Sequence, residues 1–262
     1  MSAVAQVTRP FPLITGLATV AEVAMVTPAM RCFTLTAPAF ADPGVEQPGE
    51  ILTLGWPERE EALVLPIEGW RFPGGREQHW RNFTVRRHDP AHATIDVDVY
   101  LHGDLGRAAR WGLHAAVGDV VGFAGPRTHW VPDPQVGWTL LVADETGLPA
   151  LLAILETLPA GHRAIAVAEI GDDGERQQVD SAADVELHWA SRDGRAPGTT
   201  DALFEAVHAL ELPSGRGQAW GGGEALALRD VRRHLAAHCT GVAGSTSLLG
   251  YWKHRTTPDD VD

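Results

Sequence analysis

A short segment in the first half of the chain brings a guanidinium, an aromatic ring and a hydroxyl close together. Residues 81–86 read Arg-Asn-Phe-Thr-Val-Arg and are predicted to lie near the end of a β-strand. Because alternate side chains of a strand point to opposite faces, Arg81 and Phe83 share one face, and Thr84 and Arg86 share the other. The first face could hold a flat, phosphorylated cofactor, with the guanidinium on a phosphate and the ring against the flat surface. An ordinary strand with solvated arginines fits the same residues.

A second segment, residues 102–111, passes from the end of a predicted strand through a glycine turn into a short helix. The free N–H groups at the start of such a helix bind anions, so a pyrophosphate there would need few charged side chains. An ordinary strand-to-helix turn would have the same sequence pattern. This segment is therefore a weak signal by itself.

The first half of the chain is built to position these segments on β-strands. In residues 94–102, apolar residues alternate with polar ones, as a strand buried on one face requires. Similar patterns predict strands at residues 30–36, 51–56, 82–86 and 119–124. Several short strands separated by turns favour a small antiparallel barrel or sandwich.

The pattern changes after the turn-rich residues 132–137. A compact apolar strand at residues 138–142 is followed by leucines at helical spacing in residues 146–158. The same reasoning predicts strands at 164–170, 185–190 and 218–222, helices at 200–210 and 224–238, and a polar loop at 172–184. Strands that alternate with helices form a parallel sheet covered by helices. The fold class is thus an antiparallel β domain followed by a Rossmann-like α/β domain.

Composition limits the partners of this chain. Its 262 residues include 34 acidic and 21 basic side chains, a net charge of −13, and a single lysine, Lys253. This balance argues against a nucleic-acid partner, which needs a basic surface. The longest apolar stretches are too short to cross a membrane, and the N-terminus lacks a secretory pattern, so we expect a cytoplasmic protein without membrane insertion. We take a monomer as the expected state.

The chain has no residue pattern of its own for redox or hydrolytic chemistry. Two cysteines, Cys32 and Cys239, cannot supply the four thiolates of an iron–sulfur cluster. His234 and His238 are spaced to share a helix face, but no third metal ligand is indicated, so we expect no metal site. The glycine run at 221–223 lacks the spacing of a dinucleotide fingerprint. We expect no catalytic side chain, because no nucleophile motif is present.

Six groups of residues, in order along about residues 15–255, resemble the siderophore-interacting protein family, the flavin-dependent ferric-siderophore reductases. These groups are residues 81–86, 102–111, 118–119 with 125–127, 143–146 with 148–150, 220–224 and 250–252. The resemblance implies the fold of the ferredoxin-reductase superfamily. Residues 1–135 would form a FAD-binding β-barrel, and residues 136–262 a NAD(P)H-binding α/β domain with a C-terminal extension.

The resemblance also implies a role for individual residues. Arg81 would contact the FAD phosphates, Phe83 would pack against the flavin or ribityl, and Thr84 would hydrogen-bond near flavin N5. The other residues expected to bind FAD are Arg86, Val99, Leu101, His102, Gly106, Arg107, Ala108, Ala109 and Trp111. The residues expected on the nicotinamide side are Asp144, Glu145, Thr146 and Glu224. The residues expected to bind the ferric siderophore are Arg127, Lys253 and Arg255.

Three segments depart from the pattern of the family. Phe83 stands where a tyrosine is usual, so ring stacking survives but a hydroxyl is lost. Residues 106–109 replace Gly-Pro-Ala-Ser, which removes a serine hydroxyl at Ala109 and adds the guanidinium of Arg107. Gly222 stands where an alanine is common.

The implied activity is the reduction of Fe(III) in a ferric siderophore by NAD(P)H through FAD, with release of the iron. One alternative is a flavoprotein that binds siderophores or serves biosynthesis without reducing iron. Another is a flavin oxidoreductase that has no connection with iron. NADH or NADPH would be the donor. Arg192 and Arg195 could meet a 2′-phosphate, although the sequence favours polar loop arginines at both positions.

Overall fold

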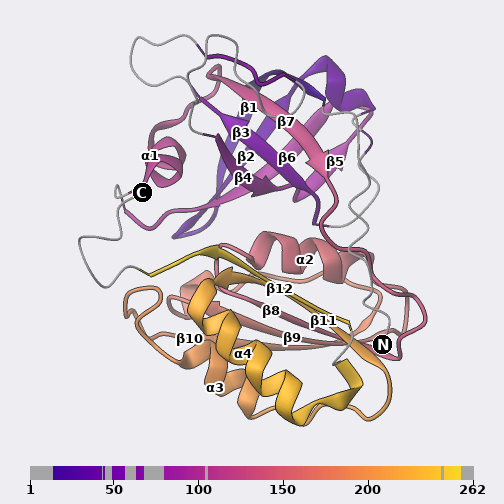
Figure 1. The fold of residues 1–262 in the computed structure, drawn as a ribbon. Helices are drawn as coiled ribbons and strands as arrows, with labels where there is room; N and C mark the ends of the chain where they lie inside the picture. Colours follow the sequence, from indigo (N-terminus) through magenta and orange to yellow (C-terminus); the bar gives the residue numbers. More distant parts are fainter. Residues whose placement is uncertain are drawn as a thin grey trace. The chain divides into compact units, whose positions relative to one another are not determined.

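The computed structural model describes residues 14–42, 44, 49–56, 63–67, 80–103, 106–242 and 245–254 (Figure 1). These residues fall into two compact units that divide at Val131 and Pro132. Arg255, and residues 104 and 105 of the glycine turn, lie outside the described residues. Within the described ranges, no helix is both long and apolar enough to span a membrane.

The N-terminal unit is an antiparallel sheet of seven strands in the order β4-β3-β7-β1-β2-β6-β5. The strands are β1 (Thr15–Thr27), β2 (Met30–Thr36), β3 (Ile51–Gly55), β4 (Trp80–Thr84), β5 (Arg87–Asp89), β6 (Thr94–Tyr100) and β7 (Val120–Arg127). The edge strands β4 and β5 are separated only by Val85 and Arg86. The N–H of Val85 donates to Glu50 before β3, and the N–H of Arg86 donates to Asp96 in β6. The sheet therefore curls, so that the short connection between its two edge strands is bonded to both sides of the sheet. Among the described pairings, β4 and β5 form no ladder with each other.

The core of this unit follows from the alternation predicted in the sequence. In β6, Ile95 and Val97 are fully buried, and Phe33 of β2 and Phe123 of β7 lie in the same core. Two short helices cover the sheet, the 3₁₀ helix η1 (Pro38–Ala41) and α1 (Arg107–His114). Arg31 donates to the carbonyls of Gly112 and Leu113, so it binds the last turn of α1.

The C-terminal unit is a parallel sheet of five strands in the order β10-β9-β8-β11-β12. Its strands are β8 (Trp138–Ala143), β9 (Arg163–Ile170), β10 (Asp184–Ser191), β11 (Gly217–Glu224) and β12 (Thr246–Trp252), and its helices are α2 (Leu148–Thr157), α3 (Ala202–His208) and α4 (Ala225–His238), with 3₁₀ turns η2 (Asp173–Glu175) and η3 (Thr240–Val242). Figure 1 shows α2 on one face of the sheet, and α3 and α4 on the other. The strand order reverses between β8 and β11, so the carboxyl ends of these two strands form the topological switch point.

The structure confirms the predicted fold class of an antiparallel domain followed by a parallel α/β domain. All three helices predicted in the C-terminal unit are present, and each is shorter than its sequence pattern. The short helix predicted within residues 102–111 is α1, which continues to His114. Three strands were not predicted. The first, β1, carries apolar and polar residues irregularly across its 13 positions, with register shifts against β2. The second, β5, has three residues, too few for a periodic pattern. The third, β12, pairs with β11 alone among the described strands, and its sequence has no alternation.

Candidate functional site

Strand β4 presents the predicted cofactor residues in very different environments. The guanidinium of Arg81 lies in solvent and donates to the carbonyl of Trp80 over 3.0 Å. Phe83 is half-buried, whereas Thr84 is buried. Arg81 and Phe83 therefore remain accessible to a ligand, and Thr84 is covered by the protein in this structure.

Phe83 belongs to an aromatic cluster with Trp56 and Trp111. The ring of Phe83 lies 5.9 Å from that of Trp111 and 6.4 Å from that of Trp56, between centroids. Trp56 and Trp111 stack at 5.3 Å with an interplanar angle of 20°. Trp111 also contacts Phe33 of the core at 4.6 Å. This cluster fixes the side chain of Phe83 between the sheet and α1. Nothing in the sequence pattern singled out Trp56.

The start of α1 has the properties of an anion site. Its N-cap is Gly106, which has no side chain to cap the helix, and its first turn contains no acidic residue. Arg107 and Ala108 are half-buried at this end, and Ala109 is buried. The helix dipole and the first N–H groups therefore favour a negative group at this end.

Other predicted residues of this unit are part of its internal structure. Arg86 is buried and lies 3.7 Å from the carboxylate of Asp98, and burial raises the pKa of Asp98. Val99 is buried beneath α1, where a Cβ on Gly112 would lie 2.8 Å from its Cγ1. Leu101 packs against the same core, whereas His102 is exposed.

Arg127 lies at the end of β7 and forms hydrogen bonds to side chains of β3 and β4. Its Nη2 donates to Oγ1 of Thr53 over 2.6 Å and to Oδ1 of Asn82 over 2.9 Å. Thr53 in turn donates to Asn82 over 2.7 Å. Burial lowers the pKa of Arg127. The half-buried guanidinium thus has a fixed direction, unlike that of a freely solvated arginine.

In the C-terminal unit, the carboxylate of Asp144 sits at the switch point and accepts five hydrogen bonds. Its Oδ1 accepts from the N–H and hydroxyl of Thr146, at 2.8 and 2.6 Å, and from the N–H of Gly147 at 3.3 Å. Its Oδ2 accepts from the N–H of Glu224 at 2.8 Å and from the indole of Trp252 at 2.7 Å. Burial raises the pKa of Asp144, while the donors from Thr146 and Trp252 oppose this rise. One carboxylate therefore joins the ends of β8, β11 and β12.

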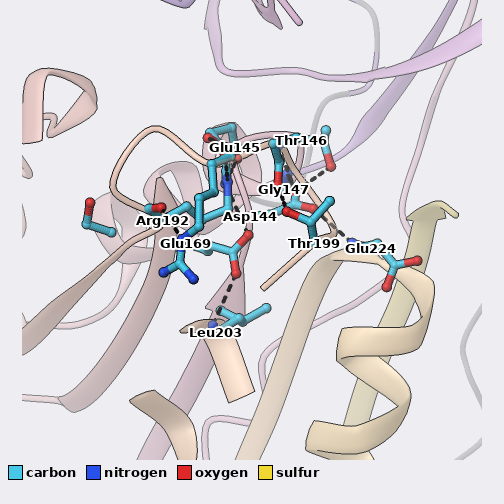
Figure 2. A network of polar contacts seen from close by, with 12 residues as sticks. Asp144, Glu145, Thr146, Gly147, Glu169, Arg192, Thr199, Leu203 and Glu224 are labelled. Atoms are coloured by element: carbon cyan, nitrogen blue, oxygen red, sulfur yellow. Dashed lines mark hydrogen bonds and ion pairs between the residues drawn. The ribbon is translucent and has the colours of Figure 1, made fainter. Parts of the chain in front are cut away.

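The neighbouring Glu145 belongs to a second buried network, shown with Asp144 in Figure 2. Arg192 donates to both oxygens of Glu145 and, over 3.0 Å, to Oε1 of Glu169. The other oxygen of Glu169 accepts from the N–H of Leu203 in the first turn of α3. Burial raises the pKa of Glu169, and the charge of Arg192 opposes the rise.

Arg192 corrects one interpretation of the sequence. The loop after β10 is polar, a pattern that favours a solvated arginine or a ligand of a 2′-phosphate at position 192. Its side chain is only 1% exposed and is neutralised by two carboxylates. A polar sequence around a charged residue does not reveal that its partners, 23 and 47 positions away, meet it inside the domain.

Glu224 caps helix α4. One oxygen of its carboxylate accepts from the N–H groups of Leu226 and Ala227, at 2.6 and 2.8 Å, and the other accepts from the N–H of His254 at 3.0 Å. Both oxygens of Glu224 therefore have partners inside the domain. The side chains of Asp144, Glu145 and Glu224 all lie at the predicted edge, but each is engaged there by other residues.

The last described residues, Tyr251–His254, cross the carboxyl edge of the sheet, and we call them the C-terminal strap. Tyr251 covers Gly222, where an added Cβ would lie 2.7 Å from Cζ of the ring. Trp252 and His254 press on Gly198 in the loop after β10, since a Cβ there would lie 3.0 and 2.8 Å from their side chains. Lys253 lies between them and is exposed. The presence of Tyr251 is a physical reason for glycine at position 222.

The two histidines considered as metal ligands stack on α4 at 4.9 Å between ring centroids, and His208 of α3 lies 5.0 Å from His234. In the part of the chain that the structure describes, no group of three or more His, Cys, Asp or Glu residues is arranged to hold a metal ion.

Comparison with known proteins identifies both units. Residues 19–130 match the family model of the siderophore-interacting FAD-binding domain, and residues 136–255 match that of the siderophore-interacting protein. A solved siderophore utilization protein from T. fusca is 33% identical and covers 96% of this chain and 97% of its own, with a TM-score of 0.84. The chain belongs to the siderophore-interacting protein family.

Further relatives of this siderophore-interacting protein differ in how much is known of them. An uncharacterised protein of Mycobacterium tuberculosis is 32% identical over 71% of this chain and 69% of its own length. The NADPH-dependent ferric-chelate reductase of Escherichia coli is 26% identical over 70% of this chain and 72% of its own. A ferredoxin NADP⁺ reductase from Neisseria gonorrhoeae is 13% identical, with a TM-score of 0.63 over 91% of this chain and 99% of its own, and at this identity it shows a shared fold alone.

Proposed function

We propose that this protein uses NAD(P)H to reduce Fe(III) in a ferric siderophore, with FAD as the electron carrier, and so releases the iron. Membership of the siderophore-interacting protein family supports the proposal, and so do the two domains, one for FAD and one with the parallel sheet of a nucleotide-binding fold. The observation that carries most weight is the first turn of α1, which has neither a side-chain cap nor an acidic residue, in a helix whose Trp111 contacts Phe83 of β4.

The residues of the N-terminal unit fit FAD. The first turn of α1 has neither a side-chain cap nor an acidic residue, so it suits a pyrophosphate next to Arg107. Arg81 offers an exposed guanidinium, and Phe83 offers a ring already held by Trp56 and Trp111. We infer that these residues bind and orient FAD, while Arg86, Val99 and Trp111 support them from the core.

When bound, FAD accepts a hydride from NAD(P)H and releases electrons singly to Fe(III). The side chains of this protein then have to bind and orient, and none needs to transfer a proton. Asp144, Glu145, Thr146 and Glu224 hold the switch-point edge in shape, and we propose that the nicotinamide nucleotide binds at this edge.

The ferric siderophore needs a local positive group, because the protein as a whole carries a net charge of −13. Lys253 is exposed, and the residues on both sides of it donate hydrogen bonds to buried carboxylates. Arg127 has a fixed guanidinium at the end of β7. We propose Lys253, Arg127 and Arg255 as chelate-binding residues.

Anaerobic reduction tests the proposal. The protein is loaded with FAD, and NADH or NADPH is added while the flavin absorbance is followed. Loss of the oxidised flavin spectrum with either donor supports a reductase. Bound FAD that neither donor reduces would favour a flavoprotein that only binds siderophores, an alternative suggested by Phe83, Arg107 and Ala109. Flavin that NAD(P)H reduces but that a ferric siderophore does not reoxidise would favour an oxidoreductase without a role in iron release.

A further inference from the structure

The C-terminal strap holds the only lysine of the chain between two fixed points. On one side, the indole of Trp252 donates to Asp144 over 2.7 Å, and on the other, the N–H of His254 donates to Glu224 over 3.0 Å. Both carboxylates are buried, with exposed fractions of 3% and 5%. Lys253 itself is exposed between these anchors.

The anchors differ from those of an ordinary chain end because both acceptors are buried. A hydrogen bond is electrostatically stronger inside a protein than in water. The side chains of Trp252 and His254 also pack closely on Gly198, which has a φ of 72° and cannot carry a larger side chain without strain. The backbone on both sides of Lys253 is therefore held by side-chain contacts from three separate loops.

We propose that Trp252 is a positioning residue, which holds Lys253 for the ferric chelate through its hydrogen bond to Asp144. This inference rests on the proposed role of Lys253 in chelate binding. A lysine on a free chain end loses conformational entropy when it binds a ligand, whereas a lysine on an anchored strap has lost most of its backbone freedom already. The anchor therefore increases affinity without itself touching the chelate.

A double-mutant cycle tests the inference in the FAD-loaded protein. The probe is a redox-inert Ga(III) complex, either tris-catecholate or tris-hydroxamate, whichever the unmodified protein binds more tightly, and calorimetry measures its affinity. Lys253→Ala is expected to weaken binding roughly tenfold. Trp252→Phe leaves a smaller aromatic ring and removes the donor, and is expected to weaken binding roughly threefold to tenfold. In the Lys253→Ala background, Trp252→Phe should change affinity by less than about twofold.

The outcomes separate the two proposals. No effect of Lys253→Ala would overturn the role of Lys253 itself. An effect of Lys253→Ala without one of Trp252→Phe would overturn the positioning role alone. Equal losses from Trp252→Phe in both backgrounds would also overturn it, since a general structural defect does not depend on Lys253. Trp189→Phe, at a half-buried tryptophan of β10, is the matched control and should leave affinity unchanged.

Discussion

Arg192 binds Glu145 through two hydrogen bonds of 2.8 and 2.6 Å, and both side chains are almost completely excluded from solvent. Arg192→Met would leave Glu145 and Glu169 buried without a cation. Breaking a buried ion pair in this way costs about 3–5 kcal/mol of unfolding free energy. Urea denaturation measures this loss. The control Arg176→Met removes an exposed pair with Asp173 and should cost at most about 1 kcal/mol. Equal stability of the two variants would contradict the account of the buried network.

Phe83→Tyr should strengthen FAD binding. The ring is already held by Trp56 and Trp111, so the added hydroxyl restores the hydrogen bond of the family's usual tyrosine without disturbing the packing. A neutral hydrogen bond corresponds to roughly a twofold to tenfold gain in affinity. Titration of the FAD-free protein with FAD measures it. Phe83→Leu, which removes the ring, should weaken binding, and equal affinity of all three proteins would show that position 83 does not meet FAD.

Gly222→Ala should destabilise the C-terminal unit, even though alanine is common at this position in the family. The new methyl would lie 2.7 Å from Cζ of Tyr251, so the ring must move. Overpacking of this kind costs about 1–3 kcal/mol. Thermal or urea denaturation should show a smaller cost in a Tyr251→Ala background. The same cost in both backgrounds would mean that Tyr251 is not what restricts position 222.

Acidification should destabilise the helical face that carries His234. Burial lowers the pKa of His234 below its ordinary value of 6.5, and the neighbouring His238 and His208 lower it further. Below pH 6.5 the unfolded chain therefore binds more protons than the folded one at this site, so stability falls as the pH falls. His234→Gln should reduce the loss of stability between about pH 7.5 and about pH 5.5. An identical loss in the variant and the unmodified protein would exclude a contribution from His234.

The sequence predicts much of the fold because the spacing of apolar residues along a strand or helix reflects which of its side chains are buried. The alternation in β6 corresponds to a buried face, and the leucine-rich α2 is buried at eight consecutive residues, 148–155. It predicts less of the site, since the partners of Asp144 and Glu145 lie far along the chain. The residues expected to meet the nicotinamide lie at the carboxyl edge of the parallel sheet. Their carboxylates, however, bind Trp252, Arg192 and the N-terminus of α4. Only packing in three dimensions brings these groups together.

The most direct test of the proposed function measures how much Fe(II) forms for each reduced FAD. The FAD-loaded protein is reduced under anaerobic conditions, freed of excess reductant and mixed with a ferric siderophore in the presence of a coloured Fe(II) chelator. Since a reduced flavin holds two electrons, we predict about two Fe(II) for each FAD, together with return of the oxidised flavin spectrum. Flavin that stays reduced while no Fe(II) appears would contradict the proposal that this protein reduces ferric siderophores.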